Sequence, residues 1–270
     1  MRIAQVISLI LFPILCYAQA NTLPKAKHHF IVVAHRGDHT EAPENTLLAY
    51  KNAIKVEADY VEIDLLTTKD SQLVIMHDAS LMRMAGLNKK VQECISDTIK
   101  NLLIRDSNHP EWGSHKIPSF EEVLKLCRGK INIYLDFKYS SVEQAYKAIV
   151  AYKMEKHVVV YINAPQQFID WRRIAPSMPL MISLPKKIST KSMMDSVLTK
   201  YPIDILDGNY NEYTAETVQA SQARGIPIWA DIQGRDEDQH WLTALSLGIN
   251  GLQTDHPKAL IGFLKHQKKR

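Results

Sequence analysis

Residues 60–78 read YVEIDLLTTKDSQLVIMHD. Two apolar runs, 60–66 and 73–77, are typical of buried strands because they are short and bounded by turn-forming residues. The polar segment 67–72 between them is too short for a helix, so we expect a hairpin turn and an antiparallel excursion. The stretch also carries three carboxylates and an imidazole within or directly after its strand-like runs.

Strand-like and helix-like patterns alternate along the remainder of the chain. The predicted strands are 31–35, 60–66, 73–77, 131–137, 157–162, 179–183, 203–207, 226–230 and 250–253. The predicted helices are 45–57, 119–127, 141–153, 165–174, 190–199, 214–224, 236–247 and 257–265. This alternation predicts an α/β protein whose parallel strands are joined by right-handed crossovers. Removing the hairpin partner leaves eight strands, the number that closes a (β/α)8 TIM barrel.

One segment, 79–117, interrupts this alternation directly after the third strand-like run. It shows no long helical or strand repeat. A link of this length without regular structure is unusual in a compact domain and is often functional. We therefore expect an insertion at this point of the barrel.

The first twenty residues have the composition of a secretory signal peptide. Arg2 supplies a positive start, 3–17 is mostly apolar, and Ala18-Gln19-Ala20 provides small residues for cleavage. The apolar run is too short to span a bilayer comfortably. We expect a secreted or periplasmic protein with no stable membrane span after signal removal, in which residues 21–270 form a single domain.

The net charge of +4 is modest, and much of the excess lies in the tail 265–270. We expect this tail to be solvated, as chain termini commonly are. No basic patch with interleaved aromatic residues occurs, so the sequence does not predict nucleic-acid binding.

Two cysteines follow the signal segment, Cys94 and Cys127. Their spacing is not that of a metal site. A disulfide between them is possible in an oxidising compartment, but we favour two buried thiols because Cys127 lies in a helical pattern.

The paired carboxylates Glu62 and Asp64 predict a metal site. Their spacing places both side chains on one face of a strand, and the apolar residues around them indicate that this strand is buried. Buried like charges repel, and a divalent cation removes the repulsion. Asp136, at the end of another apolar run, is the natural third ligand. An all-oxygen set favours Ca²⁺ or Mg²⁺; the alternative is a salt-bridged surface strand.

An ordered set of motifs resembles the glycerophosphodiester phosphodiesterase family. The motifs are His35-Arg36-Gly37, Pro43-Glu44-Asn45-Thr46, Glu62-x-Asp64, His77-Asp78, the acidic-x-Lys strand 132–138, Ile228-Trp229 and the segment 251–257. The resemblance covers roughly residues 30 to 264. It implies a TIM barrel, with the insertion near its mouth, and a phosphoric diester hydrolase. The family usually has Glu where this chain has Asp136, so the metal's identity and affinity are the least secure part of the resemblance.

His35 and His77 are the candidate catalytic pair. Cleavage of a phosphodiester needs a base for the attacking hydroxyl and an acid for the leaving alkoxide, and imidazole can fill either role. The sequence does not say which histidine is which. Two structural histidines are the alternative.

Three further residues are candidates for substrate binding. Arg36 and Lys138 have the charge to hold phosphoryl oxygens, although either could instead form a structural ion pair with Glu62. Trp229 ends a predicted strand and could form a wall for the alcohol group; a core aromatic residue is the alternative.

These residues predict a metal-dependent phosphodiesterase, and the resemblance implies that its substrate is a small glycerophosphodiester, hydrolysed to glycerol 3-phosphate and an alcohol. The alternative is a phospholipase acting on lysophospholipid or phosphoinositide-like head groups. A non-enzymatic phosphate-binding module would tolerate loss of either histidine, and both are present.

Overall fold

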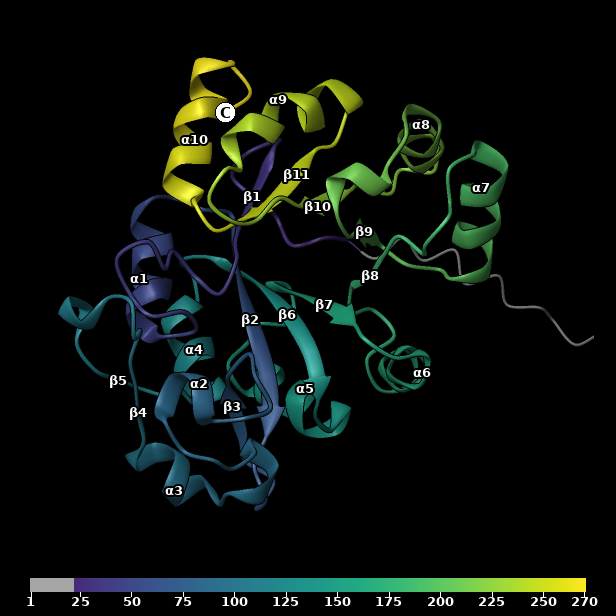
Figure 1. Cartoon of the computed structure of the whole chain (residues 1–270). Helices are drawn as coiled ribbons and strands as arrows, with labels where there is room; N and C mark the ends of the chain where they lie inside the picture. Colours follow the sequence, from purple (N-terminus) through teal and green to yellow (C-terminus); the bar gives the residue numbers. More distant parts are fainter. Residues whose placement is uncertain (1–21) are drawn as a thin grey trace, which may run out of the picture.

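A computed structural model of the chain describes residues 22–270 and shows a barrel of eight parallel strands (Figure 1). The prediction of a signal peptide over 1–20 lies outside these residues. In order around the barrel the strands are β10 (Trp229–Asp231), β11 (Gly251–Thr254), β1 (Ile31–Ala34), β2 (Tyr60–Thr67), β6 (Asn132–Tyr139), β7 (Val158–Ile162), β8 (Leu180–Ser183) and β9 (Ile205–Asp207). Parallel bridges from Leu206 to Ile228 and from Asn209 to Asp231 nearly close the ring. The predicted TIM barrel is confirmed.

Eight helices lie outside the strands in the described part of the chain, each near its predicted range. They are α1 (Leu47–Lys55), α4 (Phe120–Cys127), α5 (Val142–Ala151), α6 (Pro165–Ile174), α7 (Lys191–Lys200), α8 (Ala215–Ala223), α9 (Asp238–Leu247) and α10 (Pro257–His266). Several begin at a hydroxyl side chain that accepts a backbone N–H; Ser119, for example, accepts from Glu122 in a capping box. Their apolar faces pack on the outward-facing strand residues in one large core.

The inside of the barrel is filled by a second set of side chains, because alternate strand residues point inward. We call this set the inner cluster: Ile31, Val33, Tyr60, Tyr134, Val159, Met181, Ile205 and Trp229. The chain just before β1 closes its lower end, where Leu23 and Ala26 pack on the cluster and the Tyr60 hydroxyl donates to the Pro24 carbonyl at 3.1 Å. The barrel is therefore sealed at its amino end, and any open site lies at the carboxyl end of the strands.

The excursion predicted for 67–72 is present. β3 (Leu73–Ile75) pairs antiparallel with the last residues of β2, beyond the barrel itself. The insertion then gathers beside β3 (Figure 1) and contains, in the described structure, no element longer than six residues. Its elements are α2 (Met82–Ala85), η1 (Val91–Glu93), α3 (Ser96–Asn101), β4 (Leu103–Ile104), η2 (Pro110–Trp112) and β5 (His115–Lys116). A small apolar core of its own, which includes Met84, Ile99 and Ile104, holds it on the barrel.

The last residue of the chain departs from its prediction. Residues 265–269 of the tail are exposed, as expected, but the Arg270 side chain is 1% exposed and lies 2.7 Å from a carboxylate oxygen of Asp59. Asp59 also contacts His28 at 2.7 Å, so both ends of the described chain are held against one buried charge. A buried carboxylate needs such partners, which is why the arginine is drawn in.

Two further predictions concern cysteines and membranes. Cys94 and Cys127 are both free and buried, as favoured. Among residues 22–270, no helix is long and apolar enough to cross a bilayer.

The inner cluster leaves no room at Gly251. A methyl group there would lie 2.4 Å from Trp229 Cδ1 and 3.1 Å from Ile31 Cβ. We expect Gly251→Ala to lower the free energy of unfolding by about 2 kcal/mol, because an overpacked core must shift. Chemical denaturation checks this. Gly262→Ala is the matched control: it lies in α10 with open space around it, so it should stabilise by up to about 1 kcal/mol. Equal effects of the two substitutions would contradict the packing argument.

Candidate active site

Strand pairing brings the three predicted metal ligands together. Asp64 on β2 is in register with Asp136 on β6, and Glu62 lies one step below on the same face of β2. Ligand atoms of the three carboxylates all lie within 4.8 Å of one another. Glu62 and Asp64 are buried, whereas Asp136 is partly exposed at the rim. One divalent cation would fit between oxygen atoms at this spacing.

The charges of this cluster are incompletely balanced. Burial raises the pKa of Glu62 well above its usual range, and the charges of Asp64 and Asp136 raise it further. In the described structure no Lys or Arg side chain forms a salt bridge with Glu62; its Oε2 accepts the backbone N–H of Arg36 at 2.8 Å. Burial and the charge of Asp64 likewise raise the pKa of Asp136. An all-oxygen set short of positive charge fits a hard cation such as Ca²⁺ or Mg²⁺.

Lys138 supplies the nearest positive charge. Its Nζ lies 2.9 Å from Asp136 Oδ2 and 3.1 Å from Asp64 Oδ1. Burial alone would lower the pKa of Lys138, but the two carboxylates raise it above its ordinary value. The sequence left open whether Lys138 forms a structural ion pair with Glu62. Lys138 does form an ion pair, but its partners are Asp64 and Asp136.

Asn45 holds Asp64 from the other side. Burial would raise the pKa of Asp64, but Lys138, His77 and the Asn45 amide keep it below its usual value. The Asn45 Nδ2 donates to Asp64 Oδ2 at 2.7 Å, and the buried Tyr50 hydroxyl donates to Asn45 Oδ1 at 2.7 Å. This chain of hydrogen bonds fixes the orientation of the carboxylate.

His35 is backed by a carboxylate from the other end of the chain. Its Nδ1 lies 2.7 Å from Asp255 Oδ1, across 220 residues of sequence. Burial would raise the pKa of Asp255, but the hydrogen bond and charge of His35, with the charge of His39, hold it at about 2. The ionised Asp255 accepts the Nδ1 proton of His35, which leaves Nε2 for proton transfer.

His77 has the same arrangement with its neighbour in sequence. Its Nδ1 lies 2.7 Å from Asp78 Oδ1. Burial opposes ionisation of Asp78, but hydrogen bonds from Arg83 and His77 hold its pKa at about 2. The charge of His77 also lowers the pKa of Asp64, so this imidazole lies near the metal cluster. Each candidate histidine is thus oriented by an ionised carboxylate.

Arg36 is held at the site by Glu44. Arg36 Nη1 lies 3.1 Å from Glu44 Oε1, and its Nε is 3.6 Å from Asp64 Oδ2 and makes no hydrogen bond. The residue has a φ of 51°, in the left-handed region that non-glycine residues rarely adopt. Such strain is commonly kept at functional sites.

The sequence did not identify Arg83 as part of the site. This insertion residue lies 2.6 Å from Glu44 Oε1 and 2.6 Å from Asp78 Oδ2. Arg83 therefore links Glu44, the partner of Arg36, to Asp78, the partner of His77. No local pattern marks Arg83, because both partners reach it only through the fold.

Seven of the eight predicted site residues lie together at the mouth, and Trp229 does not. Its side chain is 2% exposed, and its ring centroid lies 4.7 Å from that of Tyr60 in the inner cluster. The predicted strand 226–230 placed Trp229 at a carboxyl end, whereas the observed β10 begins at this residue. Trp229 is therefore a core aromatic residue, which was the alternative, and not the predicted wall for the alcohol group.

Glu237 supports the loop that carries Asp255. Its Oε1 accepts the Asp255 N–H at 2.7 Å, and its Oε2 accepts the Thr254 hydroxyl. The side chain is buried, and burial raises the pKa of Glu237 from 4.5 to about 7. The folded protein therefore retains a proton here that the unfolded chain loses.

This retained proton predicts a pH dependence of stability. Between pH 4.5 and about 7 the folded state binds more protons at Glu237, so rising pH destabilises it, by about 3 kcal/mol in total. We expect Glu237→Gln to remove this loss, so that the unfolding free energies of wild type and variant diverge from pH 5 to pH 8. Glu41→Gln, at an exposed position, is the control. Parallel curves for wild type and Glu237→Gln would contradict the assignment.

Known proteins are similar to this chain over most of its length. A glycerophosphodiester phosphodiesterase of Caldanaerobacter subterraneus is 26% identical over 87% of this chain and 98% of its own. A lysophospholipase D of Rattus norvegicus is 24% identical over 96% of this chain and 92% of its own. The structure of an Oleispira antarctica phosphodiesterase, in complex with the product sn-glycerol-3-phosphate, superposes with a TM-score of 0.73 at 20% identity, covering 87% of this chain and 96% of that one.

The model of the glycerophosphoryl diester phosphodiesterase family matches residues 35–259, a range that includes all eight predicted site residues. The match spans most of the chain. The chain therefore belongs to the glycerophosphoryl diester phosphodiesterase family, as the resemblance implied, and is a phosphoric diester hydrolase.

Proposed function

We propose that this chain is a metal-dependent hydrolase that cleaves glycerophosphodiesters to glycerol 3-phosphate and an alcohol. The observation that carries the proposal is a buried triad of carboxylates, short of positive charge, beside two histidines that are each oriented by an ionised carboxylate. Family membership and the names of the relatives support the substrate class.

Glu62, Asp64 and Asp136 would hold the divalent cation. When bound, Ca²⁺ or Mg²⁺ neutralises phosphate charge and helps to generate the nucleophile. Asp136 is the adaptable member of the set, because it is partly exposed and already shares its charge with Lys138. Its shorter side chain, relative to the usual glutamate, is compatible with a site whose other two ligands are rigidly buried.

Arg36 and Lys138 are the groups that bind the phosphate. Both lie at the carboxylate cluster, and both keep a positive charge at any physiological pH, since their pKa values are raised. Burial is the largest influence on each and opposes the charge, but the surrounding carboxylates outweigh it. A phosphodiester between them would receive donors on its non-bridging oxygens, where negative charge develops during cleavage.

His35 and His77 transfer the protons. Their Nδ1 atoms are engaged by Asp255 and Asp78, so Nε2 is the atom that accepts or donates at the substrate. They come from different strands of the mouth, on either side of the β2 carboxylates. We propose that one acts on the attacking side of a bound phosphate and the other on the leaving side.

We further propose that residues 21–270 form one domain, released after removal of a signal peptide over 1–20 and active outside the cytoplasm. The positive, apolar and small-residue order of the first twenty residues supports this proposal. So does the nine-stranded sheet that takes strands from β1 to β11 of the described chain.

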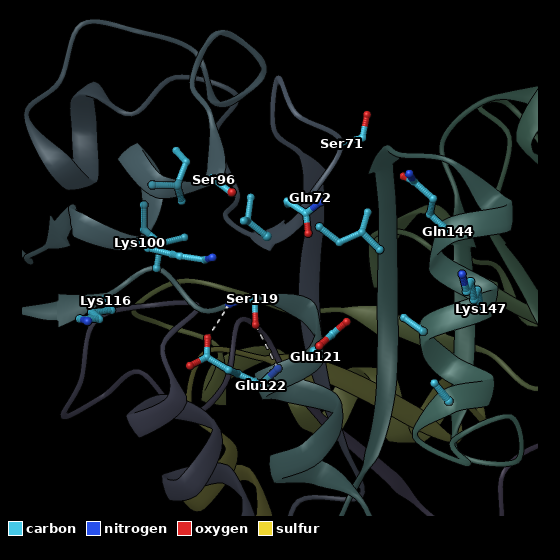
Figure 2. Close-up of a pocket in the computed structure, with 16 residues that line it drawn as sticks. Ser71, Gln72, Ser96, Lys100, Lys116, Ser119, Glu121, Glu122, Gln144 and Lys147 are labelled. Carbon is cyan, nitrogen blue, oxygen red and sulfur yellow. Dashed lines mark hydrogen bonds between the residues drawn. The ribbon is translucent and has the colours of Figure 1, made fainter.

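Lysophospholipids are a second candidate substrate class, because relatives with the name lysophospholipase D match this chain. Such a substrate needs an apolar groove beside the site. A cavity of about 660 Å³ contains Ile99 and Ile117 of the insertion, but it opens on the outer flank toward α4 and α5. Figure 2 shows its polar rim, with Lys116 on the insertion side and Lys147 on α5. None of the predicted site residues lines this cavity, so we favour water-soluble diesters.

Metal-dependent release of glycerol 3-phosphate from glycerophosphocholine tests the proposed function. We expect a chelator to abolish release and Ca²⁺ or Mg²⁺ to restore it. His35→Ala and His77→Ala should each lower kcat by about 100-fold or more, because a positioned acid or base contributes on this scale. His266→Ala, at an exposed position at the end of α10, is the control. Equal rates in wild type and both site variants would end the catalytic assignment.

Arg83 should act as a positioning residue for both halves of the site. We expect Arg83→Ala to lower kcat/KM by about 10- to 100-fold, since removing a group that orients catalytic side chains commonly costs this much. Arg83→Lys should recover only part, because an ammonium cannot bridge Glu44 and Asp78 in the same fork. The control is Arg105→Ala, which removes another insertion arginine that hydrogen-bonds Ser114. Steady-state kinetics that show the same loss for Arg105→Ala would refute the role.

A further inference from the structure

The inside of the barrel carries a complete ring of polar residues above its apolar base. Each strand contributes one of these residues. On seven strands it lies two positions after an inward-facing member of the inner cluster. On β11 it lies two positions after Gly251, where an added methyl group would meet Trp229. Side chains two apart on a strand share a face, so all eight point into the barrel. The ring consists of His35, Glu62, Asp136, Tyr161, Ser183, Asp207, Asp231 and Gln253.

The proposed chemistry uses only one side of this ring. His35, Glu62 and Asp136 come from β1, β2 and β6, whereas the other five come from the consecutive strands β7 to β11. We call these five the acceptor wall: Tyr161, Ser183, Asp207, Asp231 and Gln253. Nothing in the catalytic assignment accounts for two carboxylates here.

Hydrogen bonds within the barrel satisfy the acceptor wall only in part. Tyr134 Oη donates to Asp207 Oδ2 at 2.8 Å, and Gln253 Nε2 donates to Asp231 Oδ1 at 2.5 Å. Gln253 Oε1 is buried and has no hydrogen-bond partner among residues 22–270, in a residue that is 5% exposed. Asp207, 3% exposed, has only the Tyr134 hydroxyl and the Gly208 backbone N–H as donors, and the Tyr161 and Ser183 hydroxyls pair with each other. Buried acceptors without donors are costly and uncommon, so the wall has room for a further donor at Gln253.

The acceptor wall also lacks positive charge. In the described part of the chain, neither Asp207 nor Asp231 forms a salt bridge with a Lys or Arg side chain, unlike Asp136 with Lys138. Burial, followed by the charge of Asp231, raises the pKa of Asp207 well above its usual range. A cationic group would relieve this repulsion.

The position of Asp231 shows what can reach the wall. Asp231 is partly exposed; burial raises its pKa, and the charge of His35 opposes this rise, so Asp231 interacts with a candidate catalytic histidine. Arg36 and Lys138 stand on the β1 and β6 side of the mouth. A diester held there by its phosphate would extend one ester group across the barrel toward Asp231.

We propose that the acceptor wall is the subsite for the alcohol group of the substrate and that it selects an alcohol with a protonated primary amine. A primary ammonium supplies donors for the unpartnered Gln253 Oε1 and a positive charge beside carboxylates that have no salt bridge to a Lys or Arg in the described structure. A neutral diol supplies donors without charge, and a trimethylammonium supplies charge without donors. The inference rests on the proposed function and specifies the substrate that it favours.

Three substrates with different alcohols test this specificity. In wild type, kcat/KM for glycerophosphoethanolamine should exceed that for glycerophosphoglycerol by about tenfold, the scale of one charged hydrogen bond at a partly exposed site. Glycerophosphocholine should fall between them. Asp231→Asn should bring the ethanolamine-to-glycerol ratio close to one. Asp170→Asn, which removes a carboxylate on α6 near Arg173, should leave the ratio unchanged.

A binding measurement keeps the inference independent of turnover. Calorimetry with ethanolamine alone should detect binding to wild type that Asp231→Asn loses and that ethylene glycol does not show. Equal kcat/KM for the ethanolamine and glycerol substrates in wild type, or an unchanged ratio in Asp231→Asn, would overturn the inference. Equal rates with choline and ethanolamine would overturn the need for donors. If no diester is hydrolysed, the proposed function fails, and ethanolamine binding alone then decides whether the wall is a cation subsite.

Discussion

Burial of Glu62 between Asp64 and Asp136 is the constraint on which the remainder of the structure depends. Three carboxylates within 4.8 Å are costly to bury unless charges and donors surround them. The fold provides these from separate elements: Lys138 from β6, the Asn45 amide from the start of α1, and the Arg36 backbone N–H after β1. The negative charge that remains uncompensated at Glu62 is what would attract the proposed cation. Stability of the cation-free protein and the proposed metal binding are therefore opposed at this cluster.

The same principle explains the long-range contacts of the mouth. His35 relies on Asp255, which in turn relies on Glu237, and His77 relies on Asp78 and the insertion residue Arg83. Each contact pairs a charge or a donor with a buried or half-buried acceptor. The barrel thus holds the two candidate proton-transfer histidines through a polar network, while its apolar layers provide the packing. The insertion belongs to this network because Arg83 completes it.

The sequence predicted the barrel and most of the site, because both depend on short periodic patterns. Apolar runs marked the strands, and charged residues at their ends marked the mouth. The misplacement of Trp229 followed from an error of a few residues in one strand, since the observed β10 is Trp229–Asp231 and not 226–230. The roles of Arg83 and Asp255, and the burial of Arg270, were not predictable, because their partners are distant in sequence and meet only after folding.

A stricter use of the two-residue period of β-strands would also have identified the acceptor wall from the sequence. Asp207 and Asp231 each follow an apolar inward residue by two positions, as Glu62 follows Tyr60. The pattern is identical on both sides of the barrel, but only one side has cations beside its carboxylates. Because Arg36 and Lys138 lie on one side alone, positive charge is unevenly distributed and creates a potential gradient across the mouth, even though Glu62 has no cationic partner there. A substrate with a negative phosphate and a positive end matches that gradient in one orientation only, so the asymmetry itself can align the scissile bond with the histidines.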